Sequence, residues 1–295
     1  MIATDFRYGL DGEFPVVRCR GCGLVYLNPR PSPSALGRYY PAHYQPHRVD
    51  VRQHHNPVAA ALRSLAFRRL PGSLGAASAW LYNSLAFRAF LRDVTPGRVL
   101  DVGCGPGDYL AVWQQLGWHV EGVEPNPEVA RRAAERLGAR VHAGFIEEVS
   151  LPDGGYDVIT MSHSLEHVPS PRTVLGILRA ALARNGRLVL MVPNFAAWDR
   201  RVFGATWYGL EVPRHLYHFE PATITALLEA VGFEVEQLGG SSQPDVVIRN
   251  LRRTFGRDPE RPSTMWQRAA IGGALLPMAV LRCSTSLWVV ARARR

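Results

Sequence analysis

The stretch "VLDVGCGPGDYL", Val99 to Leu110, runs from an apolar segment directly into a glycine-rich bend. A continuous apolar run of this kind predicts a strand that is buried on both faces of a parallel sheet. The bend after it lets a ligand approach the backbone closely, because glycine has no side chain. The spacing of the glycines and the charges around them indicate which class of ligand the bend serves.

The glycines of the bend are Gly103, Gly105 and Gly107, a G-x-G-x-G spacing. A dinucleotide fingerprint, G-x-G-x-x-G, requires a glycine at position 108, where this chain has Asp108. A phosphate-binding P-loop requires a lysine, and the sequence contains none. Both phosphate-binding interpretations therefore fail on specific residues.

Carboxylates surround the bend. Asp101 ends the first strand, Asp108 follows the glycines, and Glu124 ends the next expected strand. Such charges repel a pyrophosphate and favour a ligand with an ammonium and a sulfonium group, which is S-adenosylmethionine. A carboxylate at the position of Glu124 accepts hydrogen bonds from ribose hydroxyls in NAD enzymes too, so Asp101 and the glycine spacing carry the discrimination.

Strand and helix signals alternate from Arg98 to the end of the chain. Strands are expected at 98–103, 119–125, 139–144, 156–162, 186–194, 233–238 and 285–292. Between two of them, Asn126 is a helix N-cap, Pro127 the first helical residue and Gly138 the end of the helix. This alternation predicts an α/β fold with a doubly wound, mostly parallel seven-stranded sheet, whose ligands bind beyond the carboxyl ends of the strands.

Three segments lie outside this regular pattern. Residues 1–50 form a small N-terminal segment rich in Pro, Tyr and His, and residues 51–95 are expected to be a helical linker. The main domain is expected at 96–295, with an insertion at about 241–284 before the last strand.

Composition limits the compartment and the partners. The 295-residue chain has a net charge of +9, but arginine supplies every basic residue and is spread along the sequence, which argues against nucleic acid as a partner. The four cysteines form no disulfide framework and no signal peptide begins the chain, so we expect a cytoplasmic protein. The longest apolar stretch, 269–281, is too short to span a bilayer and contains Pro277. Because it is flanked by arginines, peripheral membrane contact stays open.

At this point the sequence resembles the class I S-adenosylmethionine-dependent methyltransferases over about residues 96–240. "VLDVGCGPG" is similar to their first motif, and "GVEPN" to the acidic loop after their second strand. The resemblance implies that Asp101 and the glycine loop hold the methionine part of the cofactor, and that Glu124 holds the ribose.

Further cofactor contacts follow from the same resemblance. They are expected from Pro125 beside Glu124, from Gly144 and Phe145 next to the adenine, and from Ser162 after the fourth strand.

The segment "SHSLEHVPSP", residues 162–171, follows the fourth strand and faces the same crevice. His163-x-x-Glu166-His167 also matches a zinc-peptidase pattern, but that pattern requires a helix, and two prolines follow here at once. "LEHVPSP" is more similar to the quinone-biosynthesis O-methyltransferases, in which an E-x-x-E-H run can hold a divalent cation. This chain has His163 in place of the first glutamate, so we predict no metal site.

A long segment after the fifth expected strand, 193–221, carries several aromatic residues and the run "PRHLYHF", which is similar to a signature of the same methyltransferase group. Its rings either line an acceptor site or form a small core beneath the loop. A hydroxyl acceptor must lose a proton, and histidine is the usual base near neutral pH. His163 and His215 are the candidate bases.

Cys19-x-x-Cys22 looks like the second half of a zinc-ribbon-like extension found before some of these methyltransferases. A structural zinc site needs four ligands; histidine substitutes such as His43 or His47 are available, but without convincing spacing.

The sequence therefore predicts a methyltransferase acting on an oxygen of a small molecule, such as a sugar, a quinone-like ring or a secondary metabolite. Two alternatives stay open: a methyltransferase acting on RNA or protein, and a non-catalytic protein that binds the cofactor.

Overall fold

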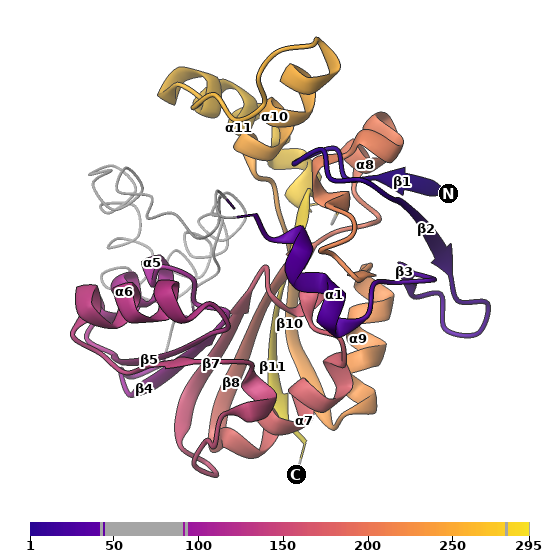
Figure 1. The fold of residues 1–295 in the computed structure, drawn as a ribbon. Coiled ribbons are helices and arrows are strands. Elements are labelled where there is room, and N and C mark those ends of the chain that lie inside the picture. The colour runs from indigo at the N-terminus through magenta and orange to yellow at the C-terminus, as the bar shows by residue number, and fades with distance from the viewer. Residues whose placement is uncertain (42–43, 45–90, 92–93, 281–282, 295) are drawn as a thin grey trace.

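The computed structural model describes residues 1–41, 44, 91, 94–280 and 283–294 (Figure 1). Nearly all of the expected helical linker, 51–95, lies outside these residues, and so do His43 and His47.

Seven strands form the main sheet, in the order β10-β11-β8-β7-β4-β5-β6. Their bounds are Arg98–Val102 (β4), His119–Glu124 (β5), Val141–Ala143 (β6), Tyr156–Ser162 (β7), Leu182–Pro193 (β8), Phe233–Ser241 (β10) and Ser286–Ala293 (β11). β11 is antiparallel to both of its neighbours, whereas β4 to β8 pair in parallel. The predicted α/β fold with a mostly parallel seven-stranded sheet is confirmed.

Helices connect the strands. They are α1 (Pro33–Leu36), α5 (Asp108–Gln115), α6 (Pro127–Leu137), α7 (Pro171–Ala181), α8 (Trp198–Phe203), α9 (Pro221–Ala230), α10 (Pro244–Thr254) and α11 (Met265–Val280). The predicted caps of α6 are confirmed: the Asn126 side chain accepts hydrogen bonds from two backbone N–H groups, and Gly138 ends the helix at φ 59°. Within the described residues, no helix is both long and apolar enough to cross a membrane.

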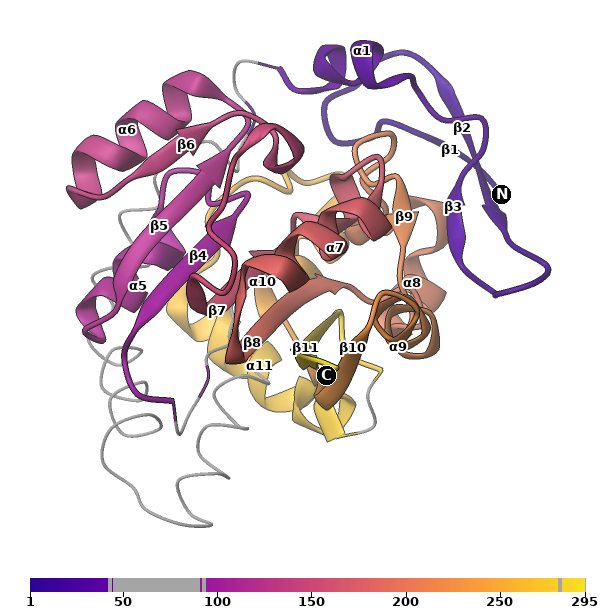
Figure 2. The same cartoon turned by 90° about the horizontal axis from the view of Figure 1, so that it is seen from below.

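The sheet is buried on both faces, which explains why its central strands are continuous apolar runs. On one face, side chains of α7 and α9 such as Leu175 and Leu228 pack on the strands. On the other, Trp113 of α5 packs with Val99 and Val158. Figure 2 shows the sheet lying between these helices.

The N-terminal segment is built into the rest of the molecule. β1 (Ile2–Thr4), β2 (Glu13–Arg18) and β3 (Val25–Leu27) form a second sheet, which β9 (Tyr217–His218) completes in the order β1-β2-β3-β9. Its apolar side chains share one core with the loop after β8: Phe14, Val16 and Leu27 pack with Trp207 and Leu216. The long loop therefore has a structured partner at the N-terminus.

Candidate functional site

The glycine loop joins β4 to α5 at the carboxyl edge of the main sheet (Figure 1). Gly103, Gly105 and Gly107 have φ angles of +78°, +54° and +79°, a backbone region that favours glycine. Space is also restricted, because a Cβ atom on Gly103 would lie 2.7 Å from Cβ of Ser164, and one on Gly107 2.7 Å from Cδ1 of Leu137. The loop therefore keeps its shape only with glycine at these positions.

Two of the predicted carboxylates lie buried beside the loop. Glu124 accepts hydrogen bonds from the backbone N–H groups of Gly105 (3.0 Å) and Asn126 (2.9 Å). Burial raises the pKa of Glu124, against the effect of these two hydrogen bonds, and the charge of Asp101 raises it further. Asp101 accepts a 2.6 Å hydrogen bond from Oγ1 of Thr160 on β7.

Asp108 differs from the expectation. Its carboxylate forms an ion pair with Arg136 of α6, with 2.8 Å between Oδ1 and Nη1. The charge of Asp108 is thus balanced by an arginine, so the negative charge beside the loop comes from Asp101 and Glu124.

The other predicted cofactor residues follow the ends of neighbouring parallel strands. Pro125 is exposed directly after β5, and the N–H of Gly144 after β6 donates to the carbonyl of Glu124 (3.0 Å). The Phe145 side chain is 56% exposed. Ser162 ends β7, and its buried Oγ atom has no hydrogen-bond partner among the described residues. The structure thus brings the predicted residues to one edge of the sheet.

His163 lies one residue beyond Ser162 in a strained backbone conformation, with φ +54°. Its N–H donates to the carbonyl of Met191 (2.8 Å). Its Nδ1 atom lies 3.5 Å from Oε1 of Glu166, and its Nε2 atom 3.2 Å from Nε2 of Gln243. The imidazole is therefore held between a carboxylate and an amide.

His215 reaches the same carboxylate from the long loop after β8. Its Nε2 atom lies 3.9 Å from Oε1 of Glu166, and its Nδ1 atom 2.9 Å from the carbonyl oxygen of Gly209. Because a carbonyl only accepts, Nδ1 carries a hydrogen and donates it to this oxygen. The structure thus places both predicted bases against Glu166.

Glu166 is the residue whose role sequence analysis missed. Its side chain is 1% exposed, and neither oxygen has a hydrogen bond of normal geometry within the described structure. Burial raises its pKa, but His163, His215 and His167 together hold it below the ordinary value. A buried carboxylate that stays ionised between imidazoles can fix their orientation and tautomers.

His167 completes the cluster. Its Nδ1 atom lies 3.1 Å from both the carbonyl oxygen of Arg214 and the hydroxyl of Tyr40, and burial lowers its pKa to about 4. The ligand atoms of Glu166, His167 and His215 lie within 4.8 Å of one another. Although we predicted no metal site, this group is compact enough to hold one ion, and imidazole and carboxylate ligands suit several transition metals.

Charged residues of the N-terminal segment fix the loop that carries His215. Both carboxylate oxygens of Asp5 accept from the buried guanidinium of Arg214, at 2.8 and 2.6 Å. Arg7 forms an ion pair with Glu211, and the hydroxyl of Tyr44 donates to Glu211 (3.2 Å). Burial raises the pKa of Glu211, but Arg7, followed by His215 and Arg214, holds it far below its ordinary value. The N-terminal segment therefore forms one wall of the histidine cluster.

Two aromatic residues of the long loop are core residues. Trp207 is 1% exposed and its Nε1–H donates to Asp199 (2.9 Å), and Tyr208 is 7% exposed with its hydroxyl donating to Glu260 (2.9 Å). For these two side chains, the interpretation as a small core beneath the loop is confirmed.

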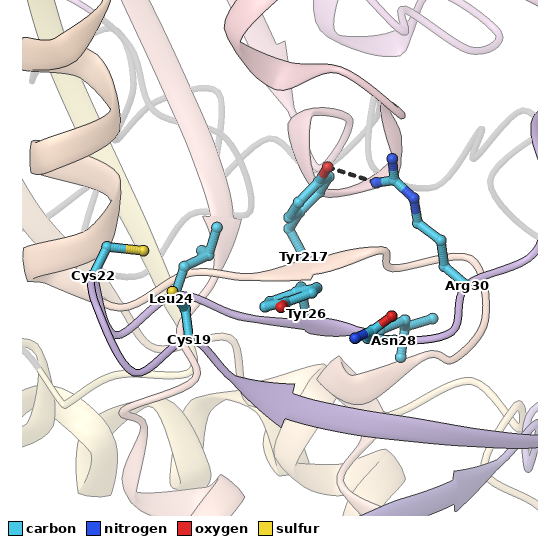
Figure 3. Close-up of a pocket in the computed structure, with 8 residues that line it drawn as sticks. Cys19, Cys22, Leu24, Tyr26, Asn28, Arg30 and Tyr217 are labelled. Carbon is cyan, nitrogen blue, oxygen red and sulfur yellow. Dashed lines mark hydrogen bonds between the residues drawn. The ribbon is translucent and has the colours of Figure 1, made fainter.

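Cys19 and Cys22 lie in the turn between β2 and β3, at one end of a cavity of about 400 Å³ (Figure 3). Tyr26 and Tyr217 line it, and Arg30 donates to the Tyr217 hydroxyl (2.6 Å). Backbone N–H groups of Cys22 and Gly21 lower the pKa of the Cys19 thiol. Within the described ranges, no third potential metal ligand joins the two thiols.

The sequence matches a family model and several curated proteins. Residues 81–238 match the family model described as "Methyltransferase domain". Over 160 residues the chain is 30% identical to the ubiquinone biosynthesis O-methyltransferase of Xanthomonas euvesicatoria pv. vesicatoria (strain 85-10), covering 50% of this chain and 67% of that protein. It is 30% identical over 155 residues to the protein of the same name from Aeromonas salmonicida (strain A449), covering 48% and 65%. The match thus spans about two thirds of these relatives.

A solved structure supports the fold alone. One chain of the complex between the Haloferax volcanii Trm112 methyltransferase activator and a methyltransferase superposes with a TM-score of 0.52 at 15% identity, covering 81% of this chain and 95% of that chain. The family match, which spans more than half of the sequence, settles the class. The chain belongs to the methyltransferase-domain family and is an S-adenosylmethionine-dependent methyltransferase.

Proposed function

We propose that the chain methylates an oxygen atom of a small molecule. The proposal rests on one observation: ring nitrogens of both His163 and His215 lie close to the buried carboxylate of Glu166, at 3.5 and 3.9 Å. This cluster adjoins the glycine loop, because the hydroxyl of Ser164 donates to the carbonyl of Val102 (2.8 Å). The names of the relatives support a hydroxylated ring as the acceptor, with sugars and secondary metabolites as the other expected classes.

We assign cofactor binding to the residues at the edge of the sheet. S-adenosylmethionine supplies an electrophilic methyl group on its sulfonium. Each carboxylate oxygen has two lone pairs, so Glu124 is able to accept from ribose hydroxyls in addition to the backbone N–H groups it already binds. The glycine loop, with the charge of Asp101 behind it, suits the methionine part.

The remaining contacts are assigned by position. We assign the exposed ring of Phe145, together with the neighbouring Gly144, to the adenine; the N–H of Phe145 already donates to Oε2 of Glu148 (3.1 Å). Pro125 and Ser162 border the same site from the ends of β5 and β7.

We assign the base to His163. When Glu166 accepts from its Nδ1–H, Nε2 accepts from the amide of Gln243 (3.2 Å). An acceptor hydroxyl that takes the place of this amide would give its proton to Nε2. The His163 side chain is 18% exposed against 6% for His215, so an acceptor reaches it more easily. His215, which faces both Glu166 and Glu211 at 3.9 Å, serves as a positioning residue. The chain otherwise gains rate by holding the acceptor in line with the methyl group.

The test is a methyl-transfer assay. Purified protein is incubated with methyl-labelled S-adenosylmethionine and a panel of phenols, catechols, sugars and secondary metabolites, and products are identified by mass spectrometry. A labelled O-methyl product supports the proposal. Label only in RNA or protein supports the first alternative acceptor class, and cofactor binding without transfer to any acceptor supports a non-catalytic role.

We retain the expected organisation as part of the proposal. In it, the N-terminal zinc-ribbon-like segment is 1–50, the helical linker is 51–95 and the methyltransferase domain is 96–295, and the insertion at about 241–284 contributes Gln243 to the site.

A further inference from the structure

The turn between β2 and β3 carries two free thiols, those of Cys19 and Cys22. The N–H of Gly23 donates to the carbonyl of Cys19 (3.0 Å), so the chain makes one helical turn between the two cysteines. In such a turn the Cα atoms of residues three apart lie about 5 Å from each other, within the range of about 4.4–6.8 Å that a disulfide spans. Figure 3 shows both thiols at the same end of the cavity. The turn therefore places the two sulfur atoms for bonding to each other.

Cys19 has the surroundings of a nucleophilic cysteine. The backbone N–H of Cys22 lowers the pKa of the Cys19 thiol, and the N–H of Gly21 and the thiol of Cys22 lower it further. Arg20, between the two cysteines, is exposed and adds a positive charge to the turn. Cys22 is exposed as well, so a second thiol is available beside the first. A lowered pKa, a nearby cation and a neighbouring exposed cysteine are features of thiols that exchange with disulfides.

The cavity beside these thiols, of about 400 Å³, has room for a small molecule. Tyr26 and Tyr217 line its middle, and Arg30 lies at the end away from the thiols (Figure 3). Among the described residues that line the cavity, Arg30 is the only charged one. Its guanidinium donates to the hydroxyl of Tyr217 (2.6 Å) and to the carbonyl of Pro169 (3.2 Å). Both partners are uncharged, so they hold the guanidinium in place without balancing its charge.

We propose that Cys19 and Cys22 form a thiol–disulfide exchange site whose substrate is a low-molecular-weight disulfide that carries carboxylates. Arg30 binds one carboxylate, the tyrosine rings contact the body of the molecule, and its sulfur–sulfur bond reaches Cys19. Arg18, the residue before Cys19, is paired with Glu220 (2.6 Å) and takes no part in this recognition. The charge of Arg30 thus favours an anionic disulfide over a neutral one.

The exchange moves two electrons from the protein to the small disulfide. The thiolate of Cys19 attacks one sulfur atom of the substrate, the sulfur–sulfur bond of the substrate breaks, and one half leaves as a thiolate. The thiolate of Cys22 then attacks the Cys19 sulfur of this mixed disulfide, and the second half leaves. The protons of the two cysteines pass through solvent to the two departing thiolates. The protein gains one disulfide bond, the substrate becomes two thiols, and no further oxidant is needed.

The experiment uses the full chain, reduced and then freed of reductant. It is mixed with glutathione disulfide, which is anionic, or with hydroxyethyl disulfide, which is neutral, and the products are followed by intact-protein mass spectrometry and peptide mapping. We expect a disulfide between Cys19 and Cys22 with either reagent. R30Q should slow the reaction with glutathione disulfide about two- to fivefold, which corresponds to at most about 1 kcal/mol for an exposed ion pair. It should leave the reaction with hydroxyethyl disulfide unchanged.

Cysteine variants separate the two steps. C22S should stop at a mixed disulfide between Cys19 and glutathione, because the second thiol is missing, and C19S should form no disulfide within the turn. The matched controls are C283S, which removes a partly buried thiol beside Met278, and R38Q, which removes an exposed arginine of the same N-terminal segment that does not line the cavity. Both controls should react like the unmodified protein, and circular dichroism shows that each variant is folded. Disulfide formation is measured without methyl transfer, so this inference is tested independently of the proposed function.

Three results overturn the proposal. The first is that neither Cys19 nor Cys22 reacts with glutathione disulfide, or that Cys283 reacts in their place. The second is that R30Q slows the reactions with both reagents equally, or slows neither. The third is zinc in the purified protein that blocks both thiols until a chelator removes it, which would identify the pair as part of a metal site.

Discussion

Replacing Gly103 with alanine tests the geometry of the glycine loop. An alanine at φ +78° costs about 1–2 kcal/mol, because the left-handed conformation brings Cβ too close to the backbone. The new Cβ would also lie 2.7 Å from Cβ of Ser164, a contact that requires a backbone shift and costs about 1–3 kcal/mol more. Gly103→Ala should therefore lower the free energy of unfolding by about 2–5 kcal/mol.

Gly138 provides the matched control. It also has a positive φ, +59°, but a Cβ atom there meets no atom within 4 Å. Gly138→Ala should lower the free energy of unfolding only by the cost of the left-handed backbone conformation, about 1–2 kcal/mol. The difference between the two variants then measures the contact with Ser164.

Urea unfolding gives both stabilities, and calorimetric titration with S-adenosylhomocysteine gives the binding. Gly103→Ala should also weaken that binding, because the loop must move, whereas Gly138→Ala should not. In a Ser164→Gly background the extra penalty of Gly103→Ala should disappear. The steric reasoning would be refuted if Gly103→Ala and Gly138→Ala lowered the free energy of unfolding equally. It would also be refuted if the extra cost of Gly103→Ala were unchanged in the Ser164→Gly background.

Two further predictions concern the histidine cluster and its wall. His163→Ala should lower kcat about 100-fold or more, and His215→Ala should lower it less, with unchanged binding of S-adenosylhomocysteine in both; unchanged turnover in both variants would exclude this assignment. Glu211 has a lowered pKa, so its stabilising effect is complete above its unfolded pKa of about 4.3 and is lost as the pH falls below it. Urea unfolding from about pH 5 to about pH 3 should thus show a steeper loss of stability in the unmodified protein than in Glu211→Gln, and parallel pH profiles would contradict this reasoning.

The cofactor side of the fold was predictable because its signals are local. The glycine spacing, the acidic residue at the end of β5 and the caps Asn126 and Gly138 each lie within a few residues of the feature they specify. Parallel strands then bring their carboxyl ends to one edge, so the placement of Gly144 beside Glu124 follows from the fold class.

The histidine cluster and the N-terminal wall beside it were not predictable, because their contacts join residues far apart in the chain. The pairing of Tyr26 with Tyr217, and of Asp5 with Arg214, leaves no periodic pattern in either segment. The central position of Glu166 depends on His215, which a loop brings back to it. Its position three residues after His163 in "SHSLEH" was the one available signal, and that spacing alone does not show burial.

The contact between Gln243 and His163 was not predictable from the sequence either. It lies in the expected insertion, and only the turn from β10 into α10 brings its amide to His163.

The most direct test of the account is a calorimetric titration of the unmodified protein with S-adenosylhomocysteine, with NADH and ATP as controls. We expect micromolar binding of S-adenosylhomocysteine alone. Glu124→Ala should weaken it tenfold or more, which is about 1.4 kcal/mol, and the nearby exposed Glu128→Gln should leave it unchanged. Binding of NADH or ATP instead, or full binding by Glu124→Ala, would contradict the assignment of the glycine loop and its buried carboxylate to this cofactor.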